Sequence, residues 1–148
     1  MQASCWSVDD LIPHRAPMAL IDEVVAFDRE ACTLTAAFSA RREWSESWAA
    51  IEYMAQASAA LAGAMDMSDG CSDVPRPGFL LGTRKLELSL PRFEPGRRYL
   101  VAVTRLFADA ESGSFECEIR DGETVVARAT LNAYLPPDAS AFLASRRA

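Results

Sequence analysis

Two kinds of hydrophobic pattern divide the chain. Residues 47–63, SWAAIEYMAQASAALAG, are almost all small or apolar, and this run predicts a helix over 48–65. Elsewhere, short apolar runs and alternating apolar and polar positions predict strands. A brief amphipathic segment, SVDDLI, opens the chain and ends at Pro13. The expected strands cover residues 19–28, 31–40, 79–91, 99–109, 114–121 and 124–135.

Turn and cap residues predict how these elements connect. Asp121–Gly122 is a strong two-residue hairpin signal between the last two strands, and Arg29–Glu30 predicts a tight turn between the first two. Pro95–Gly96 predicts a further turn before the fourth strand. Ser45 and Ser47 are candidate N-caps of the helix. Ser, Asp, Gly and Pro dominate the stretch after the helix, which indicates a loop.

The helix pattern predicts the architecture. A helix that is apolar on nearly every side is buried on nearly every side, and its many alanines allow strands to approach closely. An antiparallel sheet must bury one face, and this helix is the only sizeable element that can cover it. We therefore expect an α+β hotdog fold, a curved sheet of about six strands wrapped around one helix. It forms a single domain over 1–148, with a loose tail at 138–148.

Composition and cysteine usage limit the class of protein. Half of the 148 residues are hydrophobic, which is enough for a real core, but no run approaches eighteen apolar residues, so no membrane-spanning helix is expected. The opening MQASCWSVDD does not have the pattern of a signal peptide. The four scattered cysteines, Cys5, Cys32, Cys71 and Cys117, fit no zinc pattern and indicate free thiols in a cytoplasmic protein.

Charge is distributed unevenly along the chain. The net charge of −6 argues against nucleic-acid binding. Residues 75–105 nevertheless hold seven basic residues against two acidic ones. Such a patch either docks an acidic or phosphorylated partner or consists of solvated strand faces.

Several residue strings resemble one family. The strings LIPHRAPMALIDEVV (11–25), IEYMAQASAALAG (51–63) and FLLGTRKLELSLPRFEPG (79–96) resemble the opening, the central helix and the third strand of β-hydroxyacyl-acyl carrier protein dehydratases. The strings AIEYMAQ, RPGFLLGTR and ATLN are similar still more closely to the dehydratase-like hotdog proteins encoded in aryl polyene pigment clusters.

The resemblance implies a reaction and partners. It implies dehydration of a 3-hydroxyacyl-acyl carrier protein thioester to the trans-2-enoyl form. It further implies an acyl carrier protein substrate, no metal or cofactor, and either a homodimer or a heterodimer with a second hotdog subunit. One departure stands out: the fatty-acid enzymes carry their catalytic histidine in a Gly-His-Phe-Pro segment before the helix, whereas residues 38–50 here contain none.

Dehydration requires a base, an acid and fixed N–H dipoles at the thioester oxygen. Glu52 is the candidate acid, because its helical neighbours are mostly apolar and desolvation favours the protonated form; the nearby helix N-terminus favours the ionised form. The alternative is a carboxylate that caps a loop or points to solvent near the helix start. Gln56 lies one turn further on the same face and is a candidate to orient Glu52. His14 is the only histidine, so it is either the base or a structural residue near a dimer interface.

Further residues have candidate supporting roles. Gly82 interrupts a strand, and it marks either a close approach of the thioester to the backbone or a simple bend. Arg15 and Asp22 are expected to form a structural ion pair with each other or with a partner chain, rather than to act directly in catalysis. Four apolar residues are candidates to line an acyl tunnel, or alternatively belong to the hydrophobic core: Trp48, Met54, Phe79 and Leu81. Candidate carrier-docking residues are Arg84, Lys85, Arg92, Arg97 and Arg98, of which alternation places only some on one face.

Three functions stay open from the sequence. The first is a dehydratase with His14 and Glu52 as the catalytic pair. The second is a non-catalytic hotdog subunit that pairs with an active dehydratase. The third is an acyl thioesterase that uses Glu52, since the fold alone does not select the chemistry.

Overall fold

A computed structural model describes residues 6–13, 18–70 and 78–134 of the chain. The expected base His14, its neighbour Arg15 and the tail at 138–148 lie outside these described residues. Among the described residues, no helix is long and apolar enough to cross a membrane.

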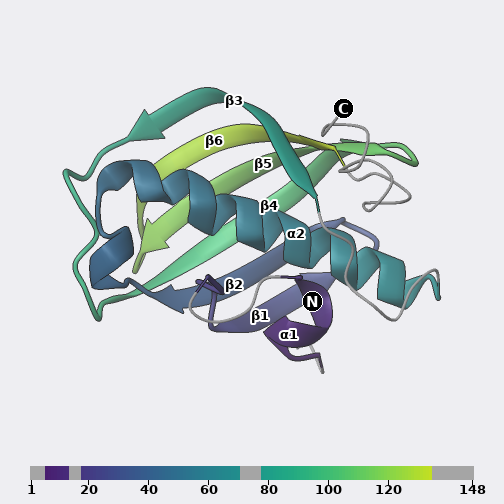
Figure 1. The fold of residues 1–148 in the computed structure, drawn as a ribbon, viewed down its shortest axis with the longest axis horizontal. Helices are drawn as coiled ribbons and strands as arrows, with labels where there is room; N and C mark the ends of the chain where they lie inside the picture. The colour runs from purple at the N-terminus through teal and green to yellow at the C-terminus, as the bar shows by residue number, and fades with distance from the viewer. Residues whose placement is uncertain (1–5, 14–17, 71–77, 135–148) are drawn as a thin grey trace, which may run out of the picture.

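Six antiparallel strands form one sheet, in the order β1-β2-β4-β5-β6-β3. Figure 1 shows the long helix α2 lying along one face of this curved sheet, with the short helix α1 near its later turns. This arrangement is the expected hotdog fold. The elements are α1 (Val8–Leu11), β1 (Glu23–Asp28), β2 (Thr33–Ser39), two 3-10 turns η1 (Arg42–Trp44) and η2 (Ser47–Ala49), α2 (Ala50–Ser68), β3 (Phe79–Leu88), β4 (Arg98–Ala108), β5 (Ser112–Asp121) and β6 (Thr124–Tyr134).

The core lies between α2 and the sheet. Side chains of β5 alternate as predicted, so Phe115, Cys117 and Ile119 are all buried. An aromatic cluster closes the N-terminal end of α2, where Phe38 stacks on Tyr53 at a centroid distance of 3.8 Å. Phe93 meets the edge of both rings. Stacked and edge-to-face pairs of this kind add stability beyond area burial, about 1 kcal/mol each.

The helix differs from the prediction at both ends. Neither Ser45 nor Ser47 is its N-cap, because a 3-10 turn precedes the helix and Ala49 takes the cap position without a side-chain hydrogen bond. Ser45 instead donates to the carbonyl of Arg42. The helix also continues beyond 65 to Ser68, because tertiary contacts extend it into residues whose composition favours a loop.

The first hairpin is shorter than expected. Its strands begin at Glu23 and Thr33, and the turn spans four residues rather than two. The Asp28 carboxylate accepts the backbone N–H of Ala31, and Cys32 adopts a left-handed conformation with φ of 55°. A side-chain bond of this kind stabilises a wider turn that apolar periodicity does not indicate.

The other turns follow the prediction. Gly122 and Gly96 both have positive φ, which glycine adopts without steric cost. Edge strand β3 is less buried than its alternation predicts, since Leu86 and Leu88 remain exposed. The reason is that β3 is an edge strand: among the described strands it pairs with β6 alone, and two register shifts interrupt this pairing.

Candidate functional site

Glu52 and Gln56 lie one helical turn apart on α2 and contact each other. Gln56 Nε2 donates to Glu52 Oε1 at 3.0 Å and to the carbonyl of Met18 at 2.7 Å. Gln56 Oε1 accepts the backbone N–H of Leu20, also at 2.7 Å. Gln56 is fully buried, so its amide is held in one orientation by three hydrogen bonds. This amide presents an N–H to the carboxylate, as the sequence suggested.

The carboxylate of Glu52 lines a mainly apolar pocket of about 140 Å³ between α2 and the sheet. One helix face contributes Glu52 with three alanines, which are only partly buried. The prediction that α2 is buried on almost every side is therefore too broad, because this face is open. The full lining is Glu52, Ala55, Ser58, Ala59, Ala62, Gly78, Leu80, Phe115, Leu131 and Ala133.

The residues expected to form an acyl tunnel occupy different environments. Met54 is completely buried in the core. Trp48 and Leu81 are 57% and 64% exposed, and neither lines the Glu52 pocket. Leu80, the neighbour of Leu81, lines it instead. The side chain of Phe79 lies outside the described part of the chain.

Gly82 lies at a register shift in β3. The pairing with β6 slips by one residue between Leu80 and Gly82. A Cβ atom at this position would meet nothing within 4 Å among the described residues, so no close backbone approach within the chain requires glycine here. The shift places Leu80 opposite Ala133, and both side chains line the Glu52 pocket.

The five basic residues lie on different elements and have different partners. Arg84 and Lys85 are exposed on edge strand β3. Arg97 bonds to Asp121 and Glu94, and Arg98 pairs with Glu23. Arg92 lies in the connection from β3 to β4. Asp22 pairs with Arg41 of the same chain at 2.9 Å. The partners expected from the sequence were Arg15, which lies outside the described residues, or a second chain.

Sequence reasoning missed the residues that hold the start of α2. Tyr53 donates its hydroxyl hydrogen to the carbonyl of Trp44 and accepts the backbone N–H of Arg41. Burial raises the pKa of the Tyr53 phenol, which keeps it a neutral donor at physiological pH. A tyrosine within an apolar run indicates only a buried ring, so these partners were not predictable from the pattern.

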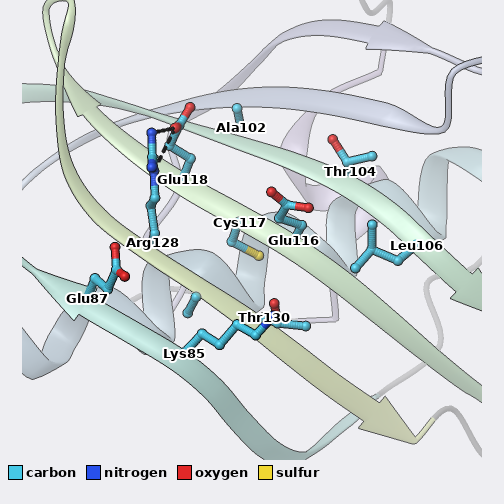
Figure 2. Close-up of a pocket in the computed structure, with 11 residues that line it drawn as sticks. Lys85, Glu87, Ala102, Thr104, Leu106, Glu116, Cys117, Glu118, Arg128 and Thr130 are labelled. Carbon is cyan, nitrogen blue, oxygen red and sulfur yellow. Dashed lines mark hydrogen bonds and ion pairs between the residues drawn. The ribbon is translucent and has the colours of Figure 1, made fainter.

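A larger hollow of about 520 Å³ lies on the outer face of the sheet (Figure 2). Its Glu118 carboxylate is engaged by Arg128, as the dashed lines show, and by Arg120. Cys117 also lines it, but its thiol is 3.4 Å from Ser58 Oγ on α2, and burial raises its pKa to about 12. A protonated, buried thiol is not a nucleophile. The Glu52 pocket is therefore the better candidate for chemistry.

The Glu52 pocket combines one carboxylate with an apolar wall. Such a site can transfer a proton to or from a ligand held against the wall. Within residues 6–13, 18–70 and 78–134, no group of three histidine, cysteine, aspartate or glutamate side chains is placed to hold a metal ion.

A curved antiparallel sheet around one long helix defines a hotdog protein. Comparison with known families specifies the family within this fold. The chain belongs to the ApeP-like family of dehydratases, whose model matches residues 6–144. It is thus a hotdog dehydratase by family. No protein with a curated description matches the chain.

Solved structures agree with this assignment. The chain is similar to a structure of the dehydratase heterocomplex ApeI:P from Xenorhabdus doucetiae, with a TM-score of 0.85, 27% identity, and coverage of 98% of this chain and 100% of that one. A putative thioesterase from Ralstonia eutropha has a TM-score of 0.57 at 14% identity, covering 76% and 83% of the two chains. An uncharacterized Pyrococcus horikoshii protein has a TM-score of 0.64 at 9% identity, covering 90% and 96%. These last two show the fold alone.

Proposed function

We propose that this protein dehydrates 3-hydroxyacyl thioesters carried by an acyl carrier protein, with Glu52 as the catalytic acid. The observation that carries the proposal is the Glu52–Gln56 pair. A carboxylate lines an apolar pocket, and a buried, fully bonded amide holds it. Membership in a dehydratase family supports this chemistry over others on the same fold.

The proposed step is a β-elimination. A base removes the proton α to the thioester carbonyl, and the electron pair forms the double bond as the C3–oxygen bond breaks. Glu52 gives its proton to the departing hydroxyl, which leaves as water. The product is the trans-2-enoyl thioester, and the thioester bond itself stays intact.

A second hotdog subunit is the other part of the proposal. Residues 38–50 contain no histidine, so the base is either His14 or a side chain of a partner. The similar Xenorhabdus structure is a heterocomplex. Edge strand β3 also exposes Leu81 and Leu88 beside an unpaired strand edge, which is a surface suited to continuation of the sheet. We propose a heterodimer in which β3 contacts a related subunit.

Conversion of a 3-hydroxyacyl carrier protein to its enoyl form tests the reaction. The chain is assayed alone and after co-expression with a second hotdog subunit. Glu52→Gln should abolish conversion, while Glu116→Gln, which changes a carboxylate on the outer face (Figure 2), should leave it intact. An unaffected Glu52→Gln variant would exclude the proposed acid. His14→Ala decides whether this chain supplies the base.

A non-catalytic subunit is the second candidate, favoured by the histidine-free segment before the helix. In that case Glu52→Gln leaves the activity of the co-expressed complex unchanged. A thioesterase would instead release a free acid, which the same assay detects by mass spectrometry.

A further inference from the structure

Two arginines from distant parts of the chain line one hollow at the start of the helix. Arg42 belongs to η1 and Arg92 to the connection between β3 and β4, and both line a hollow of about 540 Å³ with Phe93, Glu94 and Pro95. They are separated by fifty positions in the sequence, so only the fold brings them together.

Ser45 holds this arrangement. It is almost completely buried, and its hydroxyl donates to the carbonyl of Arg42 at 2.9 Å while accepting from the Arg92 guanidinium at 3.0 Å. The carbonyl of Ser45 also accepts the backbone N–H of Phe93 at 2.6 Å. One buried residue therefore connects both segments of the hollow.

Two carboxylates near the hollow, Glu94 and Glu46, pair with arginines other than Arg42. Glu94 lines it, but its carboxylate bonds to Arg97, which also binds Asp121. Glu46 is 3.9 Å from Arg92, and both side chains are well exposed, so this contact is weak. Arg42 has no hydrogen bond or ion pair to another side chain in the part of the chain that the structure describes.

We infer that this hollow binds a phosphate ester. Guanidinium groups bind phosphate oxygens through paired N–H donors, and two of them from different segments suit an anion with several oxygens. This inference rests on the proposed function, in which the acyl substrate is a thioester of a phosphopantetheine arm, and that arm contains one phosphate. The arm of a carrier protein and a free phosphorylated thioester would offer the same group.

Binding of phosphopantetheine and of pantetheine, which lacks the phosphate, tests the inference by calorimetry. The protein should bind the phosphorylated compound about fivefold more tightly, as two exposed charge contacts allow. A double variant that carries Arg42→Ala and Arg92→Ala should bind phosphopantetheine and pantetheine equally. Arg29→Ala with Arg120→Ala removes the same charge elsewhere and should keep the preference. Ser45→Ala should reduce the preference by releasing Arg92.

Persistence of the preference in the Arg42/Arg92 double variant would overturn the inference, as would its loss in the control pair. A carrier protein bearing the arm distinguishes the two sources. If the double variant weakens the carrier but not free phosphopantetheine, the arginines contact the carrier surface and the phosphate site is rejected. Glu52→Gln should retain the preference, so this binding result is separate from the test of the reaction.

Discussion

Gln56 Nε2 lies 3.0 Å from Glu52 Oε1, and the same amide spans the backbone of Met18 and Leu20. The Gln56 side chain thus joins the candidate catalytic residue to a segment that lies 36 to 38 positions before Gln56 in the chain. These hydrogen bonds give Gln56 a structural role, and the proposed function adds a positioning role toward Glu52.

Replacement of Gln56 by Leu should destabilise the protein by about 2 kcal/mol or more. The change leaves the buried Leu20 N–H without a hydrogen-bond partner and removes the donor to the part-buried Met18 carbonyl. Urea denaturation measures the effect. Glu52→Gln is the control, because its amide oxygen still accepts the Gln56 hydrogen bond, and it should change stability by less than about 0.5 kcal/mol. Equal stability of both variants would contradict the bridging role.

Gly63→Ala should destabilise the fold although alanine is the better helix former. A Cβ atom at Gly63 would lie 2.3 Å from the backbone carbonyl oxygen of Leu11, so α1 would have to move away from α2. Overpacking costs about 1–3 kcal/mol, which outweighs the propensity gain of about 1 kcal/mol. Thermal unfolding measures the difference. Gly82→Ala, where nothing lies within 4 Å, is the control and should be tolerated; a stabilised Gly63→Ala protein would refute the close packing of the two helices.

Glu118 should contribute stability that depends on pH. Partial burial acts to raise the pKa of its carboxyl, but the bonds to Arg120 and Arg128 outweigh burial and lower it. Stability from this group is therefore present above the unfolded value of about 4.3 and is lost as pH falls through the lower folded value. Glu118→Gln should cost less than about 1 kcal/mol at pH 7, because the arginines are exposed.

Measurement at low pH, where Glu118 is protonated, is the control for this prediction. The stability gap between Glu118→Gln and the parent protein should close as pH falls below about 4. Chemical denaturation at several pH values measures this gap. A gap that is the same at pH 3 and pH 7 would show that packing, and not charge, causes the loss.

Substitution of both Leu81 and Leu88 by Lys should prevent pairing with a second hotdog subunit. Both side chains are exposed on edge strand β3, where the proposed partner would continue the sheet. Charged residues on an edge strand oppose such contacts. Co-purification and sedimentation measure pairing. Leu106→Lys places the same charge on another exposed leucine, at the far end of β4, and should pair normally; pairing by the β3 variant would exclude this edge as the interface.

Much of the architecture could be read from local patterns. The alternation in β5 predicted its buried face, and Asp121–Gly122 predicted the last hairpin, because both signals act between neighbouring residues. The start of the helix could not be read this way. Ser45 matches an N-cap in composition, yet its hydroxyl is used between Arg42 and Arg92, a contact that depends on a strand connection far along the chain.

The candidate site shows the same division. The spacing of Glu52 and Gln56 alone placed both side chains on one helix face, because a helix repeats every 3.6 residues. The bonds of Gln56 to Met18 and Leu20, and the open pocket beside Glu52, depend on how the segment before β1 and strand β3 pack against α2. Likewise, the sequence predicted a basic segment, but the partners of its arginines, Asp121 for Arg97 and Glu23 for Arg98, come from other parts of the sheet.

The sequence by itself determined the order of elements, the single central helix and the carboxylate that this helix carries. These features follow from periodicity and side-chain chemistry within a few residues of each other. Only the tertiary structure decided which helix face remains open, which backbone groups orient Gln56 beside Glu52, and which two arginines share a hollow. The physical reason is that such contacts form between residues distant in the chain, whose meeting depends on the packing of the whole sheet around α2.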